Sequence, residues 1–210
     1  MELQRPLRVV TTSVDGDVLT VLAGVERAFT APGVQALLGD RSSDGVRKSL
    51  RRLSDQGIVR STKVGQAWSY ELNRGHLAPP HVIALAGLRD ALFDRIRAEV
   101  EGWSPVAELV ALFGSAARGT MAATSDVDLF VVRPDAVDVD LPDWSRQVHR
   151  LQDHVTSWTG NDARALEYSV TEVLDALGSG EERVLADIAT DGIVLGGRAG
   201  LLRALEMTYR

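Results

Sequence analysis

Apolar side chains recur three or four positions apart in three stretches near the start of the chain, at residues 15–29, 30–39 and 42–56. This spacing gathers them along one side of a helix, so the pattern predicts three amphipathic helices in succession. A shorter apolar run at residues 7–12 favours a strand ahead of them. The chain is therefore expected to begin with a strand followed by three helices.

Residues that start and stop helices lie between these stretches. Thr30 and either Ser42 or Ser43 have side-chain hydroxyls suited to capping the second and third helices. Gly39 ends the second helix, and Gly57 follows the third, where glycine readily adopts the left-handed conformation of a helix C-terminus. The helix boundaries therefore agree with the apolar pattern.

Two strand-like runs follow the third helix, at residues 58–64 and 67–72, and Gly65-Gln66 between them favours a β-hairpin. Charge is concentrated in the same region. Seven basic and two acidic residues between Arg41 and Lys63 give a local net charge of +5, which leaves −11 for the remainder of a chain whose net charge is −6. This asymmetry indicates one surface for a polyanion on an otherwise acidic protein.

The segment LRRLSDQGIVRSTKVGQAWSYELN, with its basic helix, glycine stop and hairpin, resembles the winged helix-turn-helix regulators of bacteria. The resemblance implies that the third helix docks in the major groove of double-stranded DNA while the hairpin reaches phosphates. A winged helix used only for protein contacts or dimerisation is the alternative. The DNA contacts expected on this basis are Ser42, Ser43, Arg47, Lys48, Arg51 and Lys63.

Glycine and two prolines near residues 75–80 interrupt both periodicities and divide the chain. We expect a winged-helix domain at residues 1–77, a linker helix at 78–102 and a second domain at 103–210. The fold class is therefore α+β, with a helical N-terminal domain bearing a β-hairpin and an α/β domain whose mixed sheet is flanked by helices.

The second domain contains two carboxylates that are two positions apart on a predicted strand. An apolar strand at residues 106–113 runs into Gly114-Ser115, and Asp126 and Asp128 begin the next strand. Side chains two apart on a strand point to the same face, so these carboxylates are expected side by side. Adjacent like charges favour a bound cation, and hard oxygen ligands suit Mg²⁺ or Mn²⁺.

The combination of GSAARG and SDVDL resembles the minimal nucleotidyltransferases of prokaryotes, within the DNA polymerase β-type superfamily. The resemblance implies metal binding by Asp126 and Asp128 and in-line transfer of a nucleoside monophosphate, with pyrophosphate leaving. The nucleotide contacts that it implies are Gly114, Ser115, Arg118 and Ser125.

That superfamily has a third catalytic and metal-binding carboxylate on a later strand, and the candidate here is Glu167. In the predicted strand at residues 163–170, Glu167 shares a face with small residues, as a site-lining carboxylate would. Asp162 and Glu172 are rivals at the strand's ends. Without a third ligand, the turn and the two aspartates could still bind a nucleotide without transferring it.

Three functions therefore remain open. The first is a DNA-binding transcriptional regulator with an active Mg²⁺-dependent nucleotidyltransferase domain that acts on a nucleoside triphosphate and an unknown acceptor. The second is a nucleotide-sensing transcription factor without catalysis, and the third is an antitoxin of nucleotidyltransferase type with a toxin partner. We expect a homodimer, because winged-helix regulators are often two-fold dimers.

The absence of cysteine excludes disulfides, thiolate metal sites and a cysteine nucleophile. No signal peptide is recognisable at the N-terminus, and no apolar run approaches eighteen residues. We therefore expect a soluble, cytoplasmic protein without membrane contact.

Overall fold

The computed structural model describes residues 1–179, 183–198, 200, 201, 203 and 207. The chain forms two compact units, one comprising Glu2 and Gln4–Arg89 and the other Met1, Leu3 and Asp90–Arg210. Each unit has its own hydrophobic core. The expected mixture of helices and strands in an α+β architecture is confirmed.

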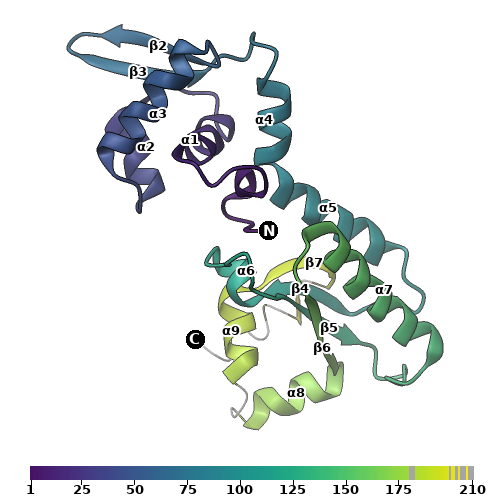
Figure 1. Ribbon diagram of the computed structural model, residues 1–210. Coiled ribbons are helices and arrows are strands. Elements are labelled where there is room, and N and C mark those ends of the chain that lie inside the picture. Colours follow the sequence, from purple (N-terminus) through teal and green to yellow (C-terminus); the bar gives the residue numbers. More distant parts are fainter. Residues whose placement is uncertain (180–182, 199, 202, 204–206, 208–210) are drawn as a thin grey trace. The chain divides into compact units, whose positions relative to one another are not determined.

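The N-terminal unit combines helices with a small antiparallel sheet (Figure 1). The sheet has the order β1-β3-β2. In chain order the elements are the 3₁₀ helix η1 (Pro6–Val9), α1 (Val14–Ala23), β1 (Phe29–Thr30), α2 (Ala31–Leu38), α3 (Ser43–Asp55), β2 (Val59–Val64), β3 (Ala67–Leu72) and α4 (Pro79–Ala86).

Local side chains explain where these elements begin and end. The Oγ1 of Thr30 accepts a hydrogen bond from Gly33 N at 3.2 Å, and the Oγ of Ser42 accepts one from Gly45 N at 3.1 Å. Both hydroxyls thus satisfy backbone donors in the first turn of a helix, as expected of an N-cap. Gly57 has a φ of 77° after α3. The predicted caps, the glycine stop and the hairpin are confirmed.

Two elements differ from the sequence prediction. Residues 6–9 form a 3₁₀ helix rather than a strand, because Pro6 fixes its own φ and the chain turns back through a hydrogen bond from Val10 N to Leu7 O. The first helix ends at Ala23, well before Phe29. Phe29 instead pairs with Tyr70 and adds the short strand β1 to the hairpin.

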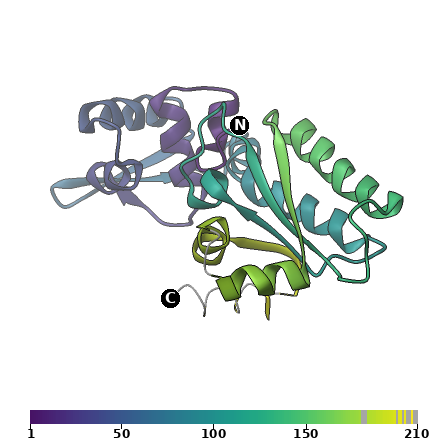
Figure 2. The same cartoon turned by 90° about the horizontal axis from the view of Figure 1, so that it is seen from below.

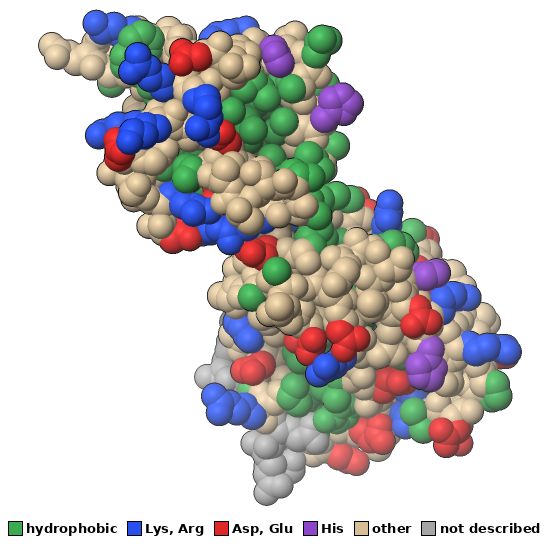
Figure 3. Space-filling view, in the orientation of Figure 1, with side chains coloured by type: hydrophobic (Ala, Val, Ile, Leu, Met, Phe, Trp, Pro, Cys, Tyr) green, Lys and Arg blue, Asp and Glu red, His purple; other side chains and the backbone are tan. Residues whose placement is uncertain are grey.

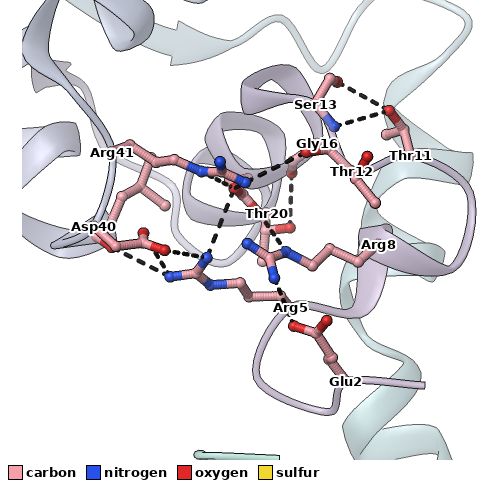
Figure 4. A network of polar contacts seen from close by, with 12 residues as sticks. Glu2, Arg5, Arg8, Thr11, Thr12, Ser13, Gly16, Thr20, Asp40 and Arg41 are labelled. Carbon is pink, nitrogen blue, oxygen red and sulfur yellow. Dashed lines mark hydrogen bonds and ion pairs between the residues drawn. The ribbon is translucent and has the colours of Figure 1, made fainter. Parts of the chain in front are cut away.

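Arg5, Arg8 and Arg41 take part in a network of polar contacts in this unit (Figure 4). Asp17 on α1 is 2% exposed, and the Nε of Arg41 donates to its Oδ2 at 2.6 Å. Arg8 and Arg5 approach the same carboxylate at 3.5 and 4.0 Å, and Arg5 also pairs with Asp40 at 2.7 Å. Arg41 therefore balances an internal charge instead of contributing to the basic surface.

The C-terminal unit is a four-stranded mixed sheet with the order β6-β5-β4-β7. Strand β4 is antiparallel to β5 and β7, whereas β5 and β6 are parallel. In chain order the elements are α5 (Leu88–Glu101), β4 (Leu109–Phe113), α6 (Gly114–Arg118), β5 (Val127–Arg133), α7 (Pro142–Thr159), β6 (Ala163–Ser169), α8 (Val170–Ser179), α9 (Arg183–Asp191) and β7 (Ile193–Gly197).

Helices cover both faces of this sheet, with α5 and α7 on one face and α8 and α9 on the other (Figure 2). Alternating residues of β5 enter the two layers. Leu129 and Val131 join the core under α5 and α7, whereas Phe130 and Val132 join the core under α8 and α9. This alternation fixes the face to which any polar side chain of β5 or β6 belongs.

The linker helix expected over residues 78–102 is two helices in the structure. Gly87, with φ −87° and ψ 8°, interrupts it and ends α4. Glycine loses most conformational freedom in a helix, so a break at this position costs little. Helix α4 belongs to the N-terminal unit and α5 almost entirely to the C-terminal unit. No helix within the described residues has both the length and the apolar character needed to cross a membrane.

Candidate functional site

The turn after β4 brings the backbone of Gly114 against the side chain of Asp128. Phe113 pairs with Asp128 across β4 and β5, and Gly114 follows with a φ of 67°. A Cβ at Gly114 would collide with the Oδ2 of Asp128. Both the left-handed backbone and the close approach therefore require glycine at this position.

Asp126 lies close enough to Asp128 to influence the ionisation of the Asp128 carboxyl. Burial raises the pKa of the Asp128 carboxyl, and the negative charge of Asp126 raises it further, while Arg164 and Arg118 oppose the change. Asp128 alternates with Leu129 and shares the sheet face of Phe130. The two aspartates thus provide concentrated negative charge beside the glycine turn, as a cation-binding site requires.

An arginine stands opposite Asp128 on the neighbouring strand. In the parallel register of β5 and β6, Asp128 is the partner of Arg164. The Nη1 of Arg164 lies 2.9 Å from the Oδ2 of Asp126, and its Nε donates to the Oδ2 of Asp162 at 3.0 Å. The position beside the aspartate pair is therefore occupied by a positive charge.

Glu167 lies on the opposite face of the sheet from Asp128. Its partner in β5 is Val131, which belongs to the core under α5 and α7. The Oε2 of Glu167 accepts a hydrogen bond from the Nε1 of Trp144, a fully buried residue of α7, at 2.8 Å. The structure therefore does not bring Glu167 together with Asp126 and Asp128.

The two rivals of Glu167 have other partners. Glu172 accepts a hydrogen bond from the backbone N–H of Ser169, and this contact lowers the pKa of Glu172. The Oγ of Ser169 accepts a bond from Glu172 N at 3.1 Å in return, so the two residues form a capping box at the start of α8. Asp162 directly precedes β6, and its carboxylate accepts a hydrogen bond from the Nε of Arg164.

The remaining predicted nucleotide contacts surround the turn. Ser115 and Arg118 lie on α6, which directly follows β4, and the Nη1 of Arg118 is 3.4 Å from Asp191 Oδ2. The Oγ of Ser125 accepts a hydrogen bond from Ala122 N at 3.0 Å, so this hydroxyl holds the loop before β5 in shape.

Asn161 is a positioning residue that sequence reasoning missed. It is 3% exposed, and its Nδ2 donates to the carbonyl oxygens of Ala123 and Ser125, each at 2.9 Å. These bonds tie the loop before Asp126 to the start of β6. The sequence signal was an asparagine directly after Gly160, which resembles an ordinary helix end.

Two carboxylates beside a turn fit one divalent cation whose other ligands come from nucleotide phosphates and water, because Mg²⁺ is commonly held in this way. Among the described residues, no cluster of three or more histidine, aspartate or glutamate side chains could hold a metal ion.

Comparison with known proteins identifies this part of the chain. Residues 94–175 match the family model described as Nucleotidyltransferase domain. These residues are a nucleotidyltransferase domain. They include the glycine turn, both aspartates, Arg164 and Glu167. Domains of this family generally use divalent metals such as Mg²⁺ or Mn²⁺.

Two solved structures are similar to part of this chain. One is a toxin–antitoxin structure with AMP-PNP, which is 21% identical, covers 56% of this chain and 80% of its own, and has a TM-score of 0.37. The other is a mutant of the toxin–antitoxin MntA-HpeT, with 18% identity, the same coverage and a TM-score of 0.36. The comparison with curated proteins found no match.

Outside the nucleotidyltransferase domain, the predicted DNA contacts lie on α3 and the hairpin. Ser42 serves as the N-cap of α3, Ser43 is exposed, and Lys48 pairs with Asp44 at 2.8 Å. Figure 3 shows lysine and arginine side chains over α3 and the hairpin of this unit.

A cleft of about 440 Å³ separates α3 from the hairpin, and Arg47 and Arg51 line it together with Trp68 and Tyr70. Trp68 is 50% exposed. Within the described part of the chain, Arg47, Arg51 and Lys63 form no ion pair with a carboxylate. These three cations are therefore available to an external anion.

Proposed function

We propose that the protein is a DNA-binding regulator whose nucleotidyltransferase domain binds a nucleoside triphosphate with one Mg²⁺ or Mn²⁺ ion and does not transfer the nucleotide. The observation that carries this proposal is that Arg164, the strand partner of Asp128, forms an ion pair with Asp126, while Glu167 lies on the other face of the sheet. The site has a place for phosphates and one cation, and the neighbouring carboxylate of Asp162 is already bound by Arg164.

Transfer of a nucleoside monophosphate requires more metal ligands than binding of the nucleotide does. In two-metal sites, one ion stabilises the attacking oxygen and the other the leaving oxygen, and carboxylates hold both ions in position. Asp126 and Asp128 provide ligands for one ion, while the positive charge of Arg164 opposes a second ion beside them. The arrangement of these three side chains therefore favours binding of a nucleotide over transfer of a nucleoside monophosphate.

The N-terminal unit supports the DNA-binding part of the proposal through its free cations. Arg47 and Arg51 project from α3, and Lys63 lies on the hairpin, so the three could contact DNA phosphates and base edges from neighbouring elements. In this proposal, nucleotide binding shifts the protein between DNA-competent and DNA-incompetent states, which requires different nucleotide affinities in the two states.

The test combines binding and turnover. The protein is incubated with labelled ATP, GTP, CTP or UTP and Mg²⁺, and both nucleotide retention and pyrophosphate release are measured. The proposal expects retention without pyrophosphate release, and loss of retention in Asp128→Asn. A DNA-binding titration with and without the retained nucleotide then tests the regulatory link, which fails if DNA affinity does not change.

An active nucleotidyltransferase is the second candidate, favoured by the family match and the complete pair of aspartates beside the glycine turn. Pyrophosphate release that disappears in Asp128→Asn would establish it. The antitoxin function predicts instead that a small toxin protein co-purifies with the chain. Sedimentation of the purified protein tests the expected homodimer.

A further inference from the structure

We propose that Arg164 binds the phosphates of the nucleotide and takes the place of a second divalent cation. This inference rests on the proposed function, since it concerns the ligand of the same site. It assigns a role to a residue on β6, the strand on which the superfamily resemblance led us to expect a third carboxylate at Glu167.

The position of Arg164 follows from the backbone register. Asp128 and Arg164 are partners, and the next partners on the same face, Phe130 with Leu166, belong to the core under α8 and α9. The side chains of Asp128 and Arg164 therefore lie on one face, at the end of the sheet where the glycine turn approaches. Arg164 is the residue of β6 that the register places beside Asp128.

Arg164 is also free to change partners. Its side chain is 65% exposed, and its two ion pairs, with Asp126 and Asp162, lie at the surface. Exposed ion pairs contribute little to stability, so exchanging them for a phosphate costs little. When a cation reaches Asp126 and Asp128, the guanidinium loses its attraction to Asp126 and becomes available to the ligand.

The chemistry of arginine suits this task. Its planar guanidinium donates parallel hydrogen bonds that match the oxygens of a phosphate, and it stays charged at every accessible pH. Two arginines, Arg118 and Arg164, act electrostatically on Asp128 from α6 and β6. A triphosphate bound with one divalent ion would thus lie near the positive charges of Arg118 on α6 and Arg164 on β6.

The test compares nucleotide affinity in three variants by equilibrium dialysis with labelled ATP, GTP, CTP and UTP, each used singly, in Mg²⁺ and in EDTA. Arg164→Gln removes the charge and is expected to weaken binding in Mg²⁺ at least about tenfold, the loss typical of a charge-assisted hydrogen bond. In EDTA the substitution should change binding much less, because without a cation Arg164 stays paired with Asp126. Arg164→Asp supplies a third carboxylate, so its binding should depend more steeply on Mg²⁺ concentration.

Arg146→Gln is the matched control, because Arg146 is an exposed arginine of α7 that is paired with Asp143, and α7 covers the other face of the sheet. It should bind as the unmodified protein does. If Arg164→Gln also binds within about twofold of the unmodified protein in Mg²⁺, the role of Arg164 is refuted while nucleotide binding stands. If the unmodified protein retains none of the four nucleotides, the proposed function itself fails.

Discussion

The indole Nε1 of Trp144 donates a hydrogen bond to the Oε2 of Glu167 at 2.8 Å, between α7 and β6. Both side chains belong to the sheet face covered by α5 and α7, whereas Asp128 belongs to the other face. Glu167, which the strand pattern predicted to be a metal ligand, thus stabilises the packing of α7 on the sheet.

Glu167→Gln should therefore leave nucleotide binding in Mg²⁺ within about twofold of the unmodified protein. The amide oxygen can still accept the indole hydrogen bond, so the free energy of unfolding should fall by less than about 1 kcal/mol. Equilibrium dialysis and urea unfolding measure the two quantities. A tenfold loss of Mg²⁺-dependent binding in a folded Glu167→Gln protein would show that Glu167 reaches the site after all.

The raised pKa of Asp128 has a consequence for stability. A carboxyl whose pKa is higher in the folded protein favours folding while it is protonated, and this contribution is lost as pH rises through the folded pKa. Asp128→Asn removes the unfavourable charge, so it should raise the thermal unfolding midpoint at pH 7. The difference should shrink at a pH below the pKa of an unfolded aspartate.

The raised pKa of Asp128 also affects cation binding. Protonation of this carboxyl favours folding but disfavours binding of a cation. Cation binding needs the ionised carboxylate, so Mg²⁺-dependent nucleotide binding should weaken as pH falls, beginning above the usual aspartate range. Calorimetric unfolding and dialysis over pH 3–8 check both trends. A lower unfolding midpoint for Asp128→Asn at pH 7 would contradict the assignment of burial and charge repulsion at this carboxyl.

Gly114→Ala tests the close approach of the turn to Asp128. Gly160 has a similar φ of 72°, but no atom lies within 4 Å of the place that an added methyl group would take, so Gly160→Ala is a matched control for backbone strain alone. Each substitution should cost about 1–2 kcal/mol in unfolding free energy. Only Gly114→Ala should also reduce nucleotide binding, because it displaces the carboxylate, and equal binding in the two variants would argue against this geometry.

Arg47→Ala and Arg51→Ala should each weaken DNA binding and lower the slope of log affinity against log salt by about 1. Arg60→Ala is the control, because Arg60 is an exposed arginine of the hairpin that pairs with Glu71 at 3.2 Å. Fluorescence anisotropy with duplex DNA at several salt concentrations measures the effect. If all three variants bind as the unmodified protein does, α3 is not the DNA-binding element.

Asp17→Asn should destabilise the protein, because Arg5, Arg8 and Arg41 would lose the carboxylate around which they gather (Figure 4). Breaking a buried ion pair from one side costs about 3–5 kcal/mol. Asp40→Asn, at an exposed partner of Arg5, should have a much smaller effect. Thermal unfolding of the two variants distinguishes them, and equal midpoints would contradict a central role for Asp17.

Local features of the chain were predictable and distant pairings were not. The caps at Thr30 and Ser42 and the hairpin around Gly65 depend on neighbouring residues, so the sequence indicates them directly. The alternation along β6 was also correct, since Ala165 and Glu167 share a face. Which face meets Asp128 depends on the register between β5 and β6, and a shift of one residue reverses it.

The net charge of residues 41–63 also could not be converted into a number of free cations from the sequence alone. A count along the sequence cannot tell that Arg41 neutralises the buried Asp17, or that Arg52 pairs with Asp15 on α1. Both partners are distant in sequence and become neighbours only through helix packing. The cations that remain for DNA are therefore fewer than the local charge of +5 suggests.

The most direct test is a crystal structure of the protein with Mn²⁺ and a non-hydrolysable triphosphate, using anomalous scattering to locate the metal. We predict one ion bound by Asp126 and Asp128, with the guanidinium of Arg164 on a phosphate and Glu167 still bonded to Trp144. An ion coordinated by Glu167, or two ions with Arg164 turned away from the phosphates, would contradict this prediction.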